Sequence, residues 1–341
     1  MSDEYLVELA PGGQTFGCGA DETILDAALR QGLDIGYGCR QGRCSTCKYQ
    51  VEDGEVDLGQ ASAYSLPDNE RDQGWALLCC ARPLTDLLIR DHRPPDTRAL
   101  PVLAPRELAA EVAEVTQLTP ELWRLAITLE APLEFYAGQF VELGLERGAR
   151  TVWRSYSMAS APSDAARLEF IMKRIEGGAF SGSIDTLAVG QPLTARGPFG
   201  TSYLRAGTRP VLLCAIGSGL APILAMLADA SARRDPRRFT LFYGARRPQD
   251  LPYLDRLPGG FDLDLTFVPT LDGLEEGDAW QGAVGNVTRA IQGGVEDAHD
   301  LDAYLCGAPP MCDAVGRLLV AKGLPQEQLY FDRFFAASDE D

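Results

Sequence analysis

The stretch Gly36-Tyr37-Gly38-Cys39-Arg40-Gln41-Gly42-Arg43-Cys44-Ser45-Thr46-Cys47 decides how the first part of this chain folds. Its three cysteines are spaced C-x4-C-x2-C, which is the plant-type ligand pattern of a 2Fe-2S cluster. The backbone must turn tightly for these thiolates to meet at one cluster. The glycines permit positive φ angles and let amide N–H groups approach the sulfurs. The sequence therefore predicts chemistry that moves one electron at a time.

The fourth ligand is ambiguous, because Cys79 and Cys80 are adjacent. Neighbouring side chains are not expected to point at the same iron, so only one of them should serve, and the residues themselves leave the choice open. Zinc sites usually contain two C-x2-C pairs, whereas only Cys44 and Cys47 form such a pair here. A non-catalytic module that binds zinc or an iron-sulfur cluster is the alternative hypothesis from another class.

The composition is that of a globular protein whose 341 residues are enough for two or three domains. The net charge of −18 argues against nucleic acid, because phosphate backbones are bound by stripes of Lys and Arg. No apolar run is as long as a membrane span, and the start Met1-Ser2-Asp3-Glu4 is acidic where a signal peptide is basic. We therefore expect a cytoplasmic protein with no membrane partner. The 9 cysteines are then unlikely to form disulfides, which favours a metal.

Residues 1–93 form the cysteine-bearing region. Thr23 precedes an amphipathic pattern and is expected to cap a short helix. Thr85-Asp86-Leu87-Leu88-Ile89 is expected to complete a sheet after the last cysteine. Prolines then punctuate residues 94–106, which we predict to be a linker.

Two further domains are expected after the linker. In residues 107–205, apolar residues alternate with polar ones around Leu125, Val141 and Phe170, which predicts a small antiparallel barrel or sandwich. Residues 206–341 contain the continuous apolar run Val211-Leu212-Leu213-Cys214-Ala215-Ile216, followed by a helical pattern. A strand buried on both faces has this composition, so we predict an α/β domain with a parallel sheet.

Two motifs in these regions suit the binding of a nucleotide cofactor. Gly217-x-Gly219-x-x-Pro222 lies between the apolar strand and a helix expected to begin at the proline, where a diphosphate would meet free N–H groups. Glycines at such a turn also serve packing alone, so both interpretations stay open. Arg154-Ser155-Tyr156-Ser157 offers a cation, a flat ring and a hydroxyl on an extended strand. An ordinary edge strand is the alternative.

In this order the motifs resemble those of the reductase components of multicomponent bacterial oxygenases. The resemblance covers nearly the whole chain and implies three fused domains: a β-grasp ferredoxin (α+β), an antiparallel β-barrel that binds FAD, and an α/β parallel-sheet domain that binds NAD. It rests on the cysteine loop, the two nucleotide motifs above, Gly178-Ala179-Phe180-Ser181, Gly197-Pro198-Phe199-Gly200, Tyr243-Gly244-Ala245-Arg246 and Cys306-Gly307-Ala308-Pro309-Pro310-Met311.

The resemblance implies roles around the flavin. Arg154 would neutralise the FAD diphosphate, Tyr156 would pack against the flavin, and Ser157 would hydrogen-bond near the N5 atom as a catalytic residue. Gly178 and Ser181 would cradle the diphosphate. A terminal aromatic residue is also expected near the flavin, in a motif where Asp332-Arg333-Phe334 replaces the more usual Glu-Lys-Phe; Phe334 is the predicted residue and Phe335 competes with it.

The resemblance also implies roles around the nicotinamide nucleotide and the cluster. Gly217, Gly219 and Pro222 would hold NADH, and Cys306 and Gly307 would line the nicotinamide side of the flavin, with Cys306 as a second catalytic candidate. Cys79 precedes Pro83 in the family's C-x3-P pattern. This implies iron ligation by Cys39, Cys44, Cys47 and Cys79, and a packing role for Cys80.

Arg246 and Arg247 bear on the choice of nucleotide, because they follow the strand beside which the adenosine ribose should lie. An arginine pair would suit the 2′-phosphate of NADPH. The resemblance instead favours NADH, with Arg246 serving the pocket and Asp250 repelling extra negative charge.

Taken together, the resemblance implies a reductase that passes electrons from NADH to FAD, then to the 2Fe-2S cluster, and then to the hydroxylase component of a separate oxygenase. Gly74-Trp75-Ala76-Leu77-Leu78-Cys79 and the domain order favour the reductases of soluble di-iron monooxygenases. A reductase of a Rieske-type aromatic-ring dioxygenase is the alternative.

Overall fold

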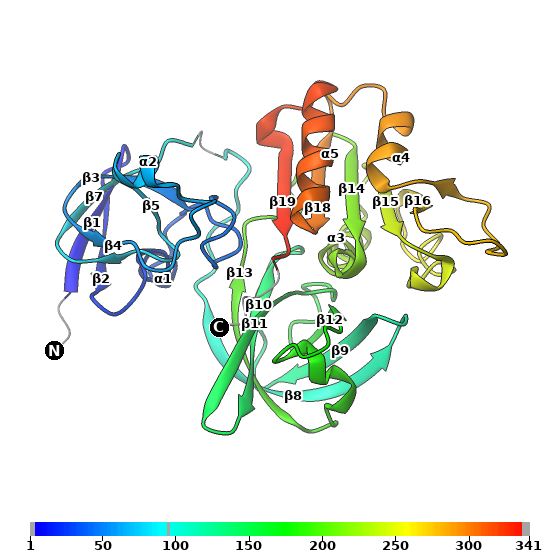
Figure 1. Cartoon of the computed structure of the whole chain (residues 1–341), viewed down its shortest axis with the longest axis horizontal. Helices are drawn as coiled ribbons and strands as arrows, with labels where there is room; N and C mark the ends of the chain where they lie inside the picture. Colours follow the sequence, from blue (N-terminus) through cyan, green and yellow to red (C-terminus); the bar gives the residue numbers. More distant parts are fainter. Residues whose placement is uncertain (1–3, 94–95, 336–341) are drawn as a thin grey trace. The chain divides into compact units, whose positions relative to one another are not determined.

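A computed structural model describes residues 4–93 and 96–335 (Figure 1). The chain divides into two compact units, Met1–Pro105 and Arg106–Asp341. A strand begins at Arg106, so the predicted linker of residues 94–106 includes the first residue of that strand. No helix in the described ranges has the length and hydropathy of a membrane crossing.

The first unit is built on a five-stranded mixed sheet covered by one main helix. The strand order is β2-β1-β7-β3-β5, in which β1 and β7 are parallel and the other neighbours are antiparallel. This is the predicted α+β class. The elements are β1 (Glu4–Ala10), β2 (Gln14–Gly19), α1 (Ile24–Arg30), β3 (Lys48–Asp53), β4 (Val56–Asp57), α2 (Asp68–Arg71), β5 (Trp75–Leu77), β6 (Arg82–Pro83) and β7 (Leu87–Arg90).

Helix α1 begins where the sequence predicts. The Thr23 hydroxyl accepts a hydrogen bond from the amide of Asp26 at 3.1 Å, which satisfies one of the free N–H groups of the first turn. The expected strand after the last cysteine is also present as β7, and it lies in the middle of the sheet between β1 and β3.

The second unit starts with a six-stranded antiparallel sheet in the order β11-β10-β13-β8-β9-β12. A bridge between Met158 and Phe170 joins its two ends, so the sheet curls into the predicted barrel. The alternating apolar residues around Leu125, Val141 and Phe170 all point into one core. The strands are β8 (Arg106–Gln117), β9 (Leu122–Leu129), β10 (Phe140–Arg147), β11 (Arg150–Ser157), β12 (Arg167–Lys173) and β13 (Pro192–Phe199), with the short helix η1 (Ser181–Thr186) before β13.

A parallel sheet in the order β17-β16-β15-β14-β18-β19 completes the second unit. Leu213 and Ala215 of β14 pack in one apolar cluster with α3, while Leu212 and Cys214 pack in another with α4 and α5. Both faces are therefore covered, which explains the continuous apolar run. The elements are β14 (Val211–Ile216), η2 (Gly217–Gly219), α3 (Leu220–Ala232), β15 (Arg238–Ala245), η3 (Pro248–Asp250), β16 (Asp264–Leu271), β17 (Ala283–Val284), α4 (Val287–Gly294), β18 (Asp302–Gly307), α5 (Pro309–Ala321), η4 (Gln326–Gln328) and β19 (Leu329–Arg333).

Helix α3 begins two residues earlier than predicted. It starts at Leu220, directly after η2, so Pro222 lies within the first helical turn instead of opening it. Proline is tolerated there because the first N–H groups of a helix have no partner inside the helix.

Candidate functional site

Four cysteine side chains of the first unit lie in two pairs. The thiols of Cys39 and Cys44 interact electrostatically with one another, and so do those of Cys47 and Cys79. Two pairs suit a 2Fe-2S cluster, which has two irons and takes four cysteine ligands. Within the described ranges, no three His, Cys, Asp or Glu side chains converge as they would around a single metal ion. The C-x4-C-x2-C spacing and the two pairs fit a two-iron cluster.

Backbone amides of the cysteine loop point at the sulfurs. The amide of Cys39 donates to Cys44 Sγ and that of Gln41 donates to Cys39 Sγ, each at 3.3 Å. The left-handed φ angles of Arg40 (58°) and Gly42 (66°) allow this inward turn. Such N–H donors stabilise negative charge on sulfur.

The pKa values of the thiols reflect this pairing. The hydrogen bond from Cys39 lowers the pKa of Cys44 to about 6, and the hydrogen bonds from Cys47 and Cys80 lower that of Cys79 to about 4. In each pair one thiol thus stabilises the ionised form of the other.

Cys80 does not turn away from its neighbour as expected. Its Sγ lies 3.8 Å from that of Cys79. Cys79, however, is the thiol that interacts electrostatically with Cys47, whereas Cys80 has its hydrogen bond with Cys79. The pairing supports the prediction that Cys79 is the fourth ligand.

Neighbouring elements hold the cysteine loop in place. The amide of Gly36 donates to the Tyr49 hydroxyl at 3.1 Å, and that hydroxyl donates to Asp91 at 3.0 Å. Arg93 binds the same carboxylate and lies over the Tyr49 ring. At the other side of the loop, Arg40 pairs with Asp26 of α1 at 2.8 Å. The loop is thereby fixed to β3, to the segment after β7 and to α1.

The predicted flavin-binding residues lie along β11. Burial raises the pKa of the Tyr156 hydroxyl, whose ring contacts Phe180 with centroids 5.3 Å apart. Arg154, two residues earlier, shares the face of Tyr156, because side chains alternate along a strand. Ser157 at the end of β11 is 7% exposed, and its hydroxyl donates to Asp332 at 2.7 Å.

Gly178 packs closely against Ser181 and Ile175. A Cβ at position 178 would lie 2.8 Å from the Ser181 hydroxyl and 3.0 Å from the carbonyl of Ile175. Ser181 is buried and is the first residue of η1, so the N-terminal end of this short helix lies beside Gly178. Close packing thus requires glycine at 178 and brings this turn against the start of η1, beside which the diphosphate is predicted.

The glycine turn after β14 combines open space and close packing. Gly217 has a φ of +53°, and nothing lies within 4 Å of where its Cβ would be. A Cβ on Gly219 would instead collide with the carbonyl of Cys306 and lie 3.0 Å from Gly307 Cα. Packing alone thus accounts for Gly219, while Gly217 offers room for a ligand. Tyr243, which sequence reasoning did not single out, donates its hydroxyl hydrogen to the carbonyl of Gly217 at 2.9 Å.

Several predicted residues meet at the carboxyl ends of β18 and β19. Cys306 is 0% exposed and pairs in register with Asp332. Burial raises the pKa of its thiol well above the usual value, and the Asp332 carboxylate adds to the effect. The amide of Phe334 donates to the carbonyl of Gly307 at 2.8 Å. With Ser157, these residues form one cluster around Asp332.

Asp332 is the site residue that sequence reasoning missed. Its signal in the sequence is its place in the terminal motif Asp332-Arg333-Phe334, at the position of the more usual glutamate. The contact with Ser157 joins positions 175 residues apart, so no local pattern indicates it.

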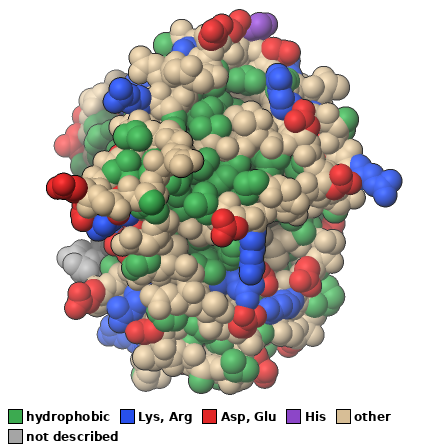
Figure 2. Space-filling view, turned by 90° about the vertical axis from the view of Figure 1, so that its right-hand side faces the viewer, with side chains coloured by type: hydrophobic (Ala, Val, Ile, Leu, Met, Phe, Trp, Pro, Cys, Tyr) green, Lys and Arg blue, Asp and Glu red, His purple; other side chains and the backbone are tan. Residues whose placement is uncertain are grey.

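The structure separates the predicted arginine pair. Arg246 is exposed. Arg247 forms ion pairs with Glu275 at 2.9 Å and Asp278 at 3.0 Å, and its amide donates to the Asp250 carboxylate at 3.1 Å. Figure 2 likewise shows basic side chains beside acidic ones on the face that it presents. Of these two arginines, only Arg246 is therefore available to contact a nucleotide phosphate.

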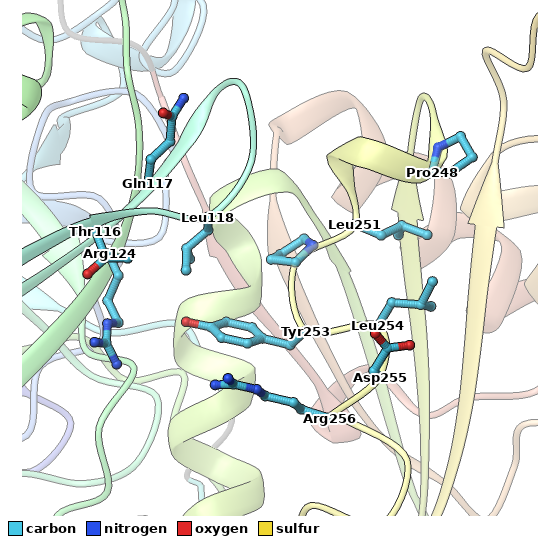
Figure 3. A pocket seen from close by; sticks show the side chains of 11 residues that line it. Thr116, Gln117, Leu118, Arg124, Pro248, Leu251, Tyr253, Leu254, Asp255 and Arg256 are labelled. Carbon is cyan, nitrogen blue, oxygen red and sulfur yellow. The ribbon is translucent and has the colours of Figure 1, made fainter. Parts of the chain in front are cut away.

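A groove of about 590 Å³ lies elsewhere in the second unit, between the β8–β9 turn and the segment that follows β15 (Figure 3). Leu118 and Tyr253 face one another across it. Arg124, which also lines it, is paired with Glu114. None of the predicted site residues lines this groove.

Comparison with known families divides the chain into three parts. Residues 7–84 match the 2Fe-2S iron-sulfur cluster binding domain, residues 109–203 the oxidoreductase FAD-binding domain, and residues 212–317 the oxidoreductase NAD-binding domain. These ranges contain the cysteine loop, the β11 motif and the glycine turn respectively.

Individual proteins match along almost the whole chain. The reductase component of phenol 2-monooxygenase from Pseudomonas sp. (strain CF600) is 36% identical over 98% of this chain and 96% of its own length. The crystal structure of the Amycolatopsis cytochrome P450 reductase GcoB matches with a TM-score of 0.87 and 33% identity, over 98% of this chain and 100% of that chain. The ferredoxin reductase in carbazole 1,9a-dioxygenase matches with a TM-score of 0.79 and 30% identity, over 98% and 99%.

Proposed function

Because the chain belongs to the family of iron-sulfur flavoprotein reductases that serve oxygenases, we propose that it is the reductase component of a soluble di-iron monooxygenase. Electrons pass from NADH through FAD and the 2Fe-2S cluster to the oxygenase. FAD and the cluster supply the redox chemistry when bound, and the protein supplies binding, orientation and electrostatics.

The described side chains support specific roles in this transfer. Tyr156 offers a ring for the flavin, and the turn at Gly178 packs against the start of η1, where the diphosphate would be held. Ser157, held by Asp332, presents its hydroxyl at the end of β11, where it can orient the reacting edge of the flavin. Cys306 is a fully buried thiol in register with Asp332, so in this position it packs and excludes water.

One observation carries the choice of partner. The 36% identity with the reductase component of phenol 2-monooxygenase runs through all three domains. The likeness to the ferredoxin reductase in carbazole 1,9a-dioxygenase keeps a Rieske-type partner as the second candidate. We place the protein in the cytoplasm, where NADH is available and where its 9 free cysteines stay reduced.

Reconstitution tests this proposal. The purified protein should contain FAD and iron, show flavin and 2Fe-2S bands, and be bleached by NADH without oxygen. It should then support NADH-dependent hydroxylation by a purified di-iron hydroxylase, and give less product with a Rieske oxygenase at equal concentration. Greater turnover with the Rieske oxygenase would reverse the choice of partner, and a colourless protein containing zinc would overturn the reductase function itself.

A further inference from the structure

Cys80 is a thiol beside the predicted cluster that no ligand position accounts for. Its Sγ lies 3.8 Å from Cys79 Sγ, which is within hydrogen-bond distance for two sulfurs. The thiol of Cys79 in turn interacts electrostatically with that of Cys47. Cys80 therefore lies directly behind one ligand of the cluster, outside the two thiol pairs.

The backbone confines the Cys80 side chain to this place. Gly42 of the cysteine loop approaches so closely that a Cβ there would lie 2.7 Å from Cys80 Sγ. Gly59 passes on another side, where a Cβ would lie 3.5 Å from Cys80 Cβ. The amide of Cys80 donates to the carbonyl of Leu77 at 2.9 Å, which fixes the turn that carries both cysteines. Gly42, with its positive φ, thus makes room for this thiol, while Gly59 packs against the Cys80 backbone.

The chemistry of the two sulfurs assigns donor and acceptor. When Cys79 binds iron it is a thiolate and can only accept a hydrogen bond. The Cys80 thiol, 3.8 Å away, has an S–H group that can donate to it. A hydrogen bond to a ligand sulfur stabilises the reduced cluster more than the oxidised one, because reduction adds negative charge.

We propose that the Cys80 thiol donates an S–H···S hydrogen bond to Cys79 and, as a positioning residue, raises the reduction potential of the cluster. The inference rests on the proposed function, because it takes Cys79 as a ligand. The cluster of the intact protein would then accept electrons from the flavin more readily than it would without this thiol.

Redox titration of the full-length holoprotein, followed by the EPR signal of the reduced cluster, tests the proposal. Cys80→Ala removes the donor, whereas the matched variant Cys80→Ser keeps an O–H group in its place. We expect both variants to retain iron and FAD. The midpoint potential of Cys80→Ala should shift to a more negative value, and that of Cys80→Ser should stay closer to the unsubstituted protein.

Other outcomes overturn the proposal. An unchanged potential in Cys80→Ala would show that the thiol does not act on the cluster, and equal shifts in both variants would show that packing is responsible. Loss of iron from Cys80→Ala and Cys80→Ser would make Cys80 the ligand. A protein that carries no 2Fe-2S cluster before substitution would contradict the proposed function instead, so the two failures are distinguishable.

Discussion

Substitution of the two adjacent cysteines should separate the ligand from its neighbour. The Cys79 thiol interacts with Cys47 of the second pair, whereas the Cys80 thiol contacts Cys79 from outside that pair. Cys79→Ser should therefore lose most of the cluster, while Cys80→Ser should keep about two irons per chain. Iron content and visible absorbance of the two purified variants provide the measurement. Cluster loss in Cys80→Ser alone would reverse the assignment.

The preference for NADH should depend on the carboxylates that form ion pairs with Arg247. Glu275 and Asp278 hold its guanidinium, so the unsubstituted protein should show a higher kcat/KM with NADH than with NADPH in ferricyanide reduction. The double variant Glu275→Gln, Asp278→Asn should raise kcat/KM for NADPH by about tenfold, the worth of one charge-assisted hydrogen bond to the 2′-phosphate.

Two controls test this explanation of nucleotide choice. Glu276→Gln removes an exposed neighbouring charge that forms no ion pair with Arg247, and it should leave the ratio nearly unchanged. Arg247→Ala added to the double variant should cancel the gain. If the unsubstituted protein already prefers NADPH, Arg246 alone is sufficient to bind the 2′-phosphate, and the expected preference for NADH is wrong.

Strand β15 is preceded by an acid-sensitive ion pair. Burial alone would raise the pKa of Asp235, but hydrogen bonds from Arg237 outweigh it, and the pKa lies below the ordinary 3.8. Because the folded pKa is lower than the unfolded one, this pair stabilises the fold above pH 3.8 and loses its effect as the pH falls further. Arg237 is almost fully buried and also lies 3.8 Å from Asp302 at the start of β18, so the pair links two parallel strands.

Asp235→Asn should therefore destabilise the fold in a manner that depends on pH. At neutral pH the unfolding temperature, followed by far-UV circular dichroism, should fall by about 2–4 °C, as expected for a loss of about 1 kcal/mol. The difference from the unsubstituted protein should vanish as the pH falls below 3.8. Asp255→Asn, at an exposed position, is the control and should show no such trend. A difference that persists in acid would mean that packing, not charge, is lost.

The division into two units predicts that each retains its cofactor. A fragment of residues 106–341 should fold, bind FAD and oxidise NADH with ferricyanide, yet reduce cytochrome c poorly because it lacks the cluster. A fragment of residues 1–93 should keep the 2Fe-2S bands, because Arg93 still binds Asp91 beneath the cysteine loop. Aggregation of the larger fragment without flavin would contradict this division.

Local sequence determined much of this protein. The C-x4-C-x2-C spacing, the alternating strands around Phe170 and the apolar run that became β14 each act over a few residues, so backbone geometry and burial suffice to interpret them. The order of these segments predicted the three domains, which the family matches confirm.

Tertiary structure decided the contacts between distant positions. It grouped the cysteines into pairs, brought Asp332 to Ser157 and left Arg246 exposed while neutralising Arg247. These outcomes depend on how β18 and β19 align beside β14 and on where the loop after β16 returns. The physical reason is that a side chain's partners are set by the register and packing of elements that meet only in the folded chain, whereas spacing within one segment fixes only the turn or strand that the segment forms.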